Sequence, residues 1–227
     1  MSRNAIVTGS ESGIGAAIAD LLRASGWSVI GVDLSPTADH VADVSDPDAV
    51  RAAVGRILED VGELDALVSA AGHYDITPVS EISAEALHRM LRVHLGGLRN
   101  TARAVLPSMA ARGGGAIVAV TSELAIGGGD GDAHYAAAKG AVIGLVRSLA
   151  AEYADRGVRI NAVAPGPTDT PLLAADSPWR APDYLATLPN RRLTRPDEIA
   201  RVVEFLVSAD AAFCTGEVIS PNGGAVI

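Results

Sequence analysis

The chain of 227 residues has little of several features that would point to other classes of protein. It has one cysteine, Cys214, so no disulfide can form within the chain and a reducing compartment suits it. It has no apolar run of about 18 residues, and we expect neither a membrane span nor a secretory signal. It has 18 basic and 27 acidic residues, and the resulting net charge of −9 argues against a general binder of nucleic acids or anionic membranes. We therefore expect a cytoplasmic protein.

Lysine is the scarcest charged residue. Lys139 is the only one, the other 17 cations are arginine, and Lys139 follows Tyr135 by four positions. Residues four apart are neighbours on a helix face, so this spacing places an ammonium beside a phenol. Arginine is planar and permanently charged, whereas lysine is compact and can shift its pKa. We expect Lys139 to lower the pKa of Tyr135 from about 10, towards a useful general acid or base.

Short apolar runs alternate with helical periodicity along the whole chain, which is typical of a parallel sheet with helices on both faces. The expected strands are 4–8, 27–32, 40–42, 66–69, 116–121, 159–163 and 217–220. Long helices are expected over 83–112, 135–153 and 196–208, and Asp46-Pro47 predicts the start of another. With 48% hydrophobic residues, the chain 1–227 is predicted to form a single α/β domain, a Rossmann-type doubly wound parallel sheet of about seven strands.

A glycine-rich segment, Thr8-Gly-Ser-Glu-Ser-Gly-Ile-Gly15, follows the first strand and opens the first helix. Glycines permit a tight turn and a close approach of backbone N–H groups to a pyrophosphate, whose charge is favoured at a helix N-terminus. The plainer alternative is a βα turn that binds no ligand.

An acidic residue, Asp33, ends the second strand about twenty residues beyond this loop. A carboxylate there can accept hydrogen bonds from an adenosine ribose and would repel a 2′-phosphate, which favours NAD over NADP. Ser12 supports NAD, because the loop offers no cation to an extra phosphate. The alternative is a solvated strand end.

Further along the chain, the glycine-rich segment and Asp33 are followed in sequence by Asp43, Ala71-Gly72, Ser122, Tyr135, Lys139, Pro165-Gly166 and Thr170. In this the chain resembles the short-chain dehydrogenase/reductase family over essentially its whole length. The resemblance implies a nicotinamide cofactor, hydride transfer between an alcohol and a carbonyl of a small molecule, and a homotetramer. The cofactor residues that we expect are Gly9, Ser12, Gly13, Ile14, Gly15, Asp33, Asp43, Val44, Ala71, Gly72, Tyr135, Lys139, Pro165, Gly166, Thr168 and Thr170.

The catalytic residues implied by the resemblance are Ser122, Tyr135 and Lys139. Tyr135 would be the base in oxidation and the acid in reduction, Ser122 would orient the substrate oxygen, and Lys139 would also bind the nicotinamide ribose. Two other hypotheses stay open: an NAD-binding sensor or scaffold that has lost its chemistry, and a lyase or epimerase on the same fold. No histidine spacing indicates a metal site.

The chain departs from the family pattern at three places. His94 stands where the family usually has asparagine at a helix kink, and it is either a structural replacement or a residue that alters proton relay or pH dependence. The segment Ser69–Gly72 lacks the asparagines that often brace the sheet. The segment Leu34–Asp39 is too short for the usual helix between the second and third strands, so an irregular crossover is expected.

By the same resemblance, residues 172–192 are expected to form a lid over the substrate, with Trp179 and Tyr184 as apolar walls. The arginines of this stretch could pair an acidic substrate group or be solvated: Arg180, Arg191 and Arg192. Glu123 and His134 flank the two predicted catalytic side chains and could line the pocket or face solvent.

Overall fold

Seven parallel strands form one sheet in the order β3-β2-β1-β4-β5-β6-β7. This computed structural model describes residues 3–226. Each strand lies within one residue of its predicted bounds: β1 (Arg3–Thr8), β2 (Trp27–Asp33), β3 (His40–Val41), β4 (Ala66–Ser69), β5 (Gly115–Val120), β6 (Val158–Val163) and β7 (Val218–Ile219). The central strands are buried on both faces, as continuous apolar runs require.

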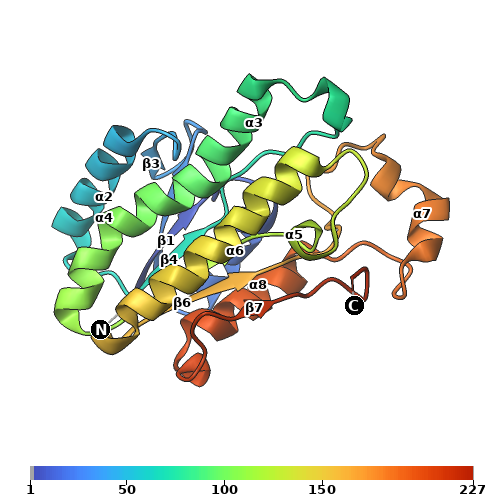
Figure 1. Cartoon of the computed structure of the whole chain (residues 1–227). Helices are drawn as coiled ribbons and strands as arrows, with labels where there is room; N and C mark the ends of the chain where they lie inside the picture. The colour runs from blue at the N-terminus through green and yellow to red at the C-terminus, as the bar shows by residue number, and fades with distance from the viewer. Residues whose placement is uncertain (1–2, 227) are drawn as a thin grey trace.

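Helices cover both faces of this sheet (Figure 1). On one face α2 (Pro47–Val61), α4 (Gly97–Arg112) and α6 (Ala133–Tyr153) pack on alternate strand residues such as Ile6 and Leu67. On the other, α1 (Gly13–Ala24) and α8 (Pro196–Val207) pack on their neighbours Val7 and Val68. The predicted doubly wound fold is therefore confirmed.

Shorter helical segments lie in the connections. They are α3 (Ala84–Leu91), α5 (Leu124–Gly127), α7 (Pro182–Thr187), a π-helical turn (Arg92–Gly96) and 3₁₀ turns at Val79–Glu81, Ala154–Arg156, Pro178–Arg180 and Ala209–Ala211. The crossover from β2 to β3 contains no helix, as its length predicts, and Asp39 closes it by accepting a hydrogen bond from the backbone N of Gly31 at 2.7 Å. None of the helices within residues 3–226 combines the length and the apolar character that a bilayer crossing needs.

The prediction of one uninterrupted helix over 83–112 is wrong. The π-helical turn Arg92–Gly96 separates α3 from α4, and such turns are frequent at functional sites. Close packing explains the glycine at the first position of α4: a Cβ on Gly97 would lie only 2.9 Å from Cγ2 of Val44. Gly97 therefore lets the start of α4 pack closely on the segment after β3.

His94 lies inside this π-helical turn and is buried at 4% exposure. Its ring packs against Gly72, where a Cβ would overlap the Cε1 atom of the imidazole. Position 72 therefore needs glycine for a second reason, besides any close approach of a ligand: the His94 imidazole occupies the space that a side chain at position 72 would need.

The start of α2 gives a first test. The Asp46 carboxylate accepts hydrogen bonds from the backbone N of Asp48 at 2.8 Å and of Ala49 at 3.2 Å, and Pro47 begins the helix. We predict that Asp46→Ala lowers the free energy of unfolding by about 1 kcal/mol, measured by urea denaturation. Asp46→Asn, which keeps an N-cap oxygen, should lose much less. Equal losses for the two variants would contradict the capping role.

The contact between Gly72 and His94 gives a second test. We predict that Gly72→Ala lowers the free energy of unfolding by about 1–3 kcal/mol, because the imidazole has to move. The loss should shrink when His94→Asn removes the overlapping atom, so the double-mutant cycle should show coupling. Gly114→Ala is the matched control, since a Cβ there meets no atom within 4 Å. Additive effects of the two substitutions would show that the contact does not matter.

Candidate active site

A cleft of about 530 Å³ opens at the carboxyl ends of the strands. It lies where the strand order reverses between β1 and β4, which is the position of ligand sites in open α/β sheets. All the residues predicted for cofactor binding or for chemistry line this one cleft, from Gly9 in the first loop to Thr170 after β6. The structure therefore brings together segments that are more than 150 residues apart in the sequence.

The glycine-rich loop joins β1 to α1 with a backbone that larger residues would not tolerate. Gly9 and Gly13 have φ of 69° and 55°, in the left-handed region. A Cβ on Gly15 would overlap the carbonyl oxygen of Gly9, so the loop and the first turn of α1 are in direct contact. The Ser12 side chain does not cap this helix, and the N–H groups of its first turn can serve an anion in the cleft.

The Asp33 carboxylate at the end of β2 is held in place by two backbone groups. It accepts hydrogen bonds from the N of Glu11 at 3.1 Å and from the N of Ser35 at 3.0 Å. Each carboxylate oxygen can accept more than one hydrogen bond, so both remain able to receive ribose hydroxyls.

Thr8 has a bracing role that the sequence reasoning missed. Its Oγ1 accepts hydrogen bonds from the backbone N of Ala70 at 3.1 Å and of Ala71 at 3.2 Å. The hydroxyl thereby ties the end of β1 to the loop after β4, in a segment that lacks asparagines. A threonine at the last position of β1 was the available signal.

Two hydrogen bonds fasten α6 to the end of β5. Lys139 Nζ donates to the carbonyl of Val120 at 2.8 Å, and Thr121 Oγ1 donates to the carbonyl of Lys139 at 2.8 Å. Both side chains are buried, and burial lowers the pKa of Lys139 to about 7. This attachment holds Ser122, just after β5, and Tyr135, in the first turn of α6, in the same cleft.

The pKa of Tyr135 shifts in the direction opposite to the predicted one. Burial raises it, the Glu123 carboxylate adds to the rise, and the neighbouring Ser122 hydroxyl partly offsets it. The Lys139 Nζ lies 5.6 Å from the centre of the Tyr135 ring and is itself desolvated. Desolvation therefore outweighs the nearby cation, and the phenol is neutral over the ordinary pH range.

His94 also packs against the Tyr135 ring. The centres of the His94 and Tyr135 rings are 5.4 Å apart in an edge-on arrangement. Burial keeps the pKa of His94 well below its usual value, so the imidazole is neutral, and its Nε2 lies 2.9 Å from the carbonyl of His73. Nε2 also lies 3.5 Å from the backbone N of His73, so its donor or acceptor role depends on the tautomer, and Nδ1 has no hydrogen-bond partner among the described residues.

A chain of hydrogen bonds links the segment 172–192 to the catalytic helix. Trp179 Nε1 donates to Tyr74 Oη at 2.8 Å, and Tyr74 Oη donates to Asp132 Oδ1 at 2.7 Å. The Tyr74 ring packs edge-on against Tyr135 at 4.9 Å, and Trp179 packs on Tyr184 at 4.7 Å. Trp179 and Tyr184 line the cleft as predicted, whereas the parts played by Tyr74 and Asp132 were not foreseen.

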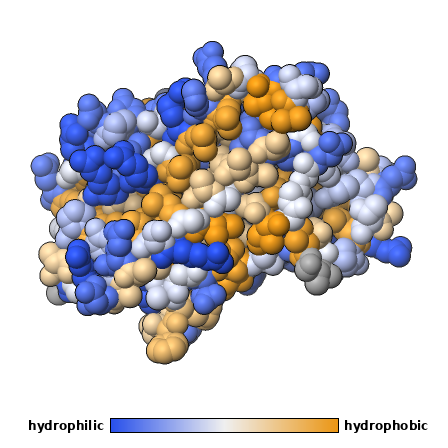
Figure 2. Space-filling view, viewed as in Figure 1, coloured by the Kyte–Doolittle hydropathy of each residue, from blue (hydrophilic) through white to orange (hydrophobic). Residues whose placement is uncertain are grey.

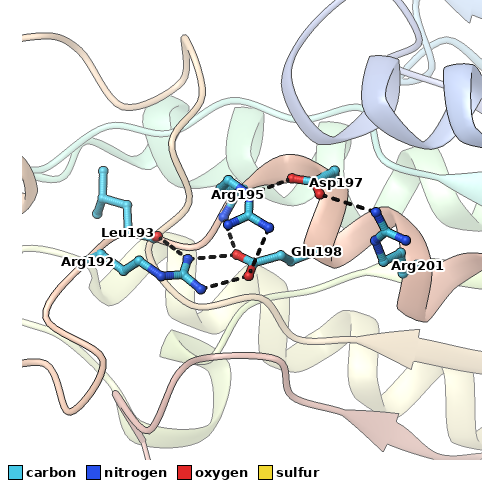
Figure 3. A network of polar contacts seen from close by, with 6 residues as sticks. All are labelled: Arg192, Leu193, Arg195, Asp197, Glu198 and Arg201. Carbon is cyan, nitrogen blue, oxygen red and sulfur yellow. Dashed lines mark hydrogen bonds and ion pairs between the residues drawn. The ribbon is translucent and has the colours of Figure 1, made fainter.

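Two of the three arginines of this segment, Arg180 and Arg192, are engaged within the chain. Arg180 Nη1 pairs with Asp169 at 2.7 Å, and its other nitrogens donate to backbone carbonyls. Figure 3 shows the bidentate ion pair between Arg192 and Glu198. The Glu198 carboxylate also accepts a hydrogen bond from the backbone N of Arg195. The contacts of Arg192 join residues 172–192 to the start of α8. Because Arg180 and Arg192 are both paired within the chain, neither is free to form an ion pair with an acidic group of a substrate.

Of the two residues that flank the predicted catalytic side chains, Glu123 lines the pocket and His134 does not. Glu123 is 7% exposed, lines the cleft, and receives the Ser122 hydroxyl hydrogen bond at 2.9 Å. His134 is 3% exposed but does not line the cleft, so it neither faces solvent nor contributes to the pocket. Among residues 3–226, no group of three or more histidine, cysteine or acidic side chains is placed to hold a metal ion.

Comparison with known proteins identifies the family. Residues 8–226 match the family model described as enoyl-(acyl carrier protein) reductase. The chain is 39% identical to cis-4-hydroxycyclohexanecarboxylate dehydrogenase of Sinomonas cyclohexanicum, over 98% of this chain and 96% of that one. It is 36% identical to the 3-oxoacyl-[acyl-carrier-protein] reductase FabG of Vibrio cholerae, over 97% and 96%.

Solved structures agree with this result. The crystal structure of levodione reductase superposes with a TM-score of 0.92 at 33% identity and covers 98% of this chain and 96% of its own. The aldohexose dehydrogenase of Thermoplasma acidophilum gives a TM-score of 0.91 at 31% identity, over 98% and 93%. With the cleft and its residues in the order described above, the chain belongs to the short-chain dehydrogenase/reductase family of oxidoreductases, which act on alcohol or ketone substrates with a nicotinamide cofactor.

Proposed function

We propose that the protein is an NAD(H)-dependent oxidoreductase that transfers a hydride between the cofactor and a secondary alcohol or its ketone. One observation carries the proposal: the side chains of Ser122, Tyr135 and Lys139 meet in the same cleft as the glycine-rich loop and Asp33. A proton donor or acceptor, a hydroxyl to hold the substrate oxygen and a nucleotide site are then contiguous, which is what alcohol–ketone chemistry needs.

The cleft fits a dinucleotide. Gly15 allows the glycine-rich loop to pack directly on the first turn of α1, whose uncapped N–H groups line the cleft side of the loop and favour a pyrophosphate there. Asp33 would receive the ribose hydroxyls, Asp43 and Val44 would border the adenine, and Thr168 and Thr170 would hold the carboxamide. The cofactor supplies the hydride acceptor or donor, and the residues of this chain supply binding, orientation and proton transfer.

Each catalytic side chain has a defined task in this proposal. Tyr135 is neutral because burial raises its pKa, so in reduction it can give its proton to the carbonyl oxygen. In oxidation the reverse step starts from the Tyr135 phenolate, which accepts the proton of the alcohol. Ser122 donates a hydrogen bond to the same oxygen. Lys139, held by the carbonyl of Val120, would meet the nicotinamide ribose and stabilise negative charge that develops on Tyr135.

The substrate would lie between the catalytic residues and a lid formed by residues 172–192. Tyr74, Trp179 and Tyr184 give this side of the cleft an aromatic wall that suits a compact apolar ring or chain. The names of two relatives, cis-4-hydroxycyclohexanecarboxylate dehydrogenase and levodione reductase, supply the first substrates to test.

We extend the proposal to assembly and location. Figure 2 shows apolar residues along the alanine-rich surface of α6, which also carries Gly140 and Gly144, where a Cβ would meet no atom within 4 Å. Small residues allow helices to approach closely, which suits a homotetramer built through such helices. The single cysteine suits the cytoplasm.

The mechanism predicts a selective loss of turnover in Tyr135→Phe. Removal of one hydroxyl should reduce kcat by about 10²–10⁴-fold, because the proton donor is lost, while calorimetry should still detect NAD binding. Formation or consumption of NADH would be followed with cis-4-hydroxycyclohexanecarboxylate, levodione, aldohexoses and 3-oxoacyl thioesters. Tyr153→Phe, at the far end of α6, is the matched control. Full turnover by Tyr135→Phe would refute the mechanism, and NAD binding without turnover by the wild type on any substrate would favour a sensor or scaffold.

The proposed cofactor preference rests on Asp33. We predict that NAD binds at least about tenfold more tightly than NADP, which corresponds to about 1.4 kcal/mol, because a carboxylate at this place repels a 2′-phosphate. Asp33→Ser should narrow the difference, and Asp20→Ser, on the exposed side of α1, should not. Calorimetric titration of each variant with both cofactors measures this. Equal affinity of the wild type for the two would rule out the assignment.

A further inference from the structure

The carboxylate of Glu123 lies directly beside the Ser122 hydroxyl, inside the cleft. Ser122 Oγ donates to Glu123 Oε2 at 2.9 Å and accepts a hydrogen bond from the backbone N of Leu124 at 3.1 Å. Both acidic and hydroxyl side chains are nearly buried, with 7% and 5% exposure. None of the ion pairs formed within residues 3–226 includes Glu123. The acid is therefore not a structural salt bridge, and its one side-chain partner is the proposed substrate-binding serine.

A serine hydroxyl has a single hydrogen and two lone pairs. In the arrangement seen here, one lone pair accepts the hydrogen bond from the backbone N of Leu124, and the hydroxyl hydrogen is donated to the Glu123 carboxylate. That hydrogen is then not available to a substrate oxygen. If the Glu123 carboxyl carries a proton instead, its O–H can donate to the second lone pair of Ser122 across the same distance. The serine hydrogen is then free to turn into the cleft.

We propose that Glu123 is a positioning residue that decides whether the hydrogen of Ser122 points at the neighbouring carboxylate or at the substrate oxygen. The inference rests on the proposed function, because it assigns a reactive and an unreactive arrangement to the same serine. Glu123 itself keeps its proton throughout the reaction, and the proton that reaches the ketone oxygen still comes from Tyr135.

The surroundings of Glu123 make both arrangements accessible near neutral pH. Burial raises its pKa to about 7, and Asp132 at the start of α6 adds to the rise. The Ser122 hydroxyl and the N–H groups of Glu123 and Leu124 favour the carboxylate and limit the shift. The other titratable groups that feel its charge are the phenols of Tyr135 on α6 and Tyr184 on α7. The ammonium of Lys139 is bound to the carbonyl of Val120 instead.

The expected pH dependence has a definite sign. Below a pH of about 7 Glu123 is protonated, the serine hydrogen is free, and ketone reduction proceeds. As the pH rises through about 7 the carboxylate forms and captures the hydrogen, so kcat/KM for reduction falls. Tyr135 stays protonated in this window because its pKa is raised. We expect a fall of about tenfold or more, towards the 10²–10³-fold loss that follows removal of a hydrogen-bond donor to a developing oxyanion.

Glu123→Gln tests this directly, because its amide can donate to Ser122 at every pH. The falling limb should disappear, and above a pH of about 7 the variant should reduce ketones faster than the wild type. Glu152→Gln, an exposed position on α6, is the matched control and should keep the wild-type profile. If Lys139, whose pKa also lies at about 7, caused the falling limb, the limb would remain in Glu123→Gln. A falling limb that persists in Glu123→Gln would therefore assign it to another group and overturn the proposal.

A second readout needs neither a substrate nor a cofactor. Infrared spectra of the wild type should show a protonated carboxyl band that titrates near a pH of 7 and is missing in Glu123→Gln. In Ser122→Ala the midpoint should move to higher pH, because the hydroxyl that stabilises the carboxylate is gone. Absence of such a band, or a midpoint that ignores Ser122→Ala, would refute the coupling even if turnover were found. Turnover that fails with an intact titration would instead fault the proposed function.

Discussion

The rest of the site depends on the reciprocal hydrogen bonds between α6 and the end of β5. Lys139 reaches the carbonyl of Val120 while Thr121 reaches the carbonyl of Lys139, each at 2.8 Å. The pair fixes the helix along its axis relative to the strand, so Tyr135 and Ser122 come to the same cleft although they belong to different elements. A compact ammonium at the end of a flexible chain can make this buried contact, whereas a planar guanidinium would bring five N–H donors that all need partners. This explains why an arginine-rich chain keeps one lysine.

Much of the fold could be predicted because it follows from local patterns. Apolar runs gave every strand within one residue, and the glycine-rich loop with Asp33 gave the nucleotide side of the cleft. What could not be predicted depends on contacts between distant segments. The close contact beside the π-helical turn joins Gly97 to Val44 in a separate segment, and the fit of Gly72 to His94 requires two elements that are 22 residues apart. The same is true of Thr8, whose hydroxyl braces a loop more than 60 residues away.

The direction of the Tyr135 pKa shows a different limit of sequence reasoning. Spacing correctly placed a cation near the phenol, but the outcome depends on how much water the fold removes from both groups. Here burial raises the pKa of the phenol and lowers that of the ammonium, so each group is driven towards its neutral form. Arg180 and Arg192 show the same limit for ion pairs, since only the fold brings Asp169 and Glu198 to them.

Desolvation also explains why an acid and a base can stand in one cleft without neutralising each other as an ion pair. Glu123 and Lys139 both have a pKa of about 7, reached from opposite sides, and each is bound to a neutral partner: the Ser122 hydroxyl and the Val120 carbonyl. A direct salt bridge between them would hold both groups in their charged forms and draw the ammonium away from β5. By keeping them apart, the fold leaves two groups that gain or lose a proton at little free-energy cost near neutral pH, in the same cleft as a phenol that must give one up.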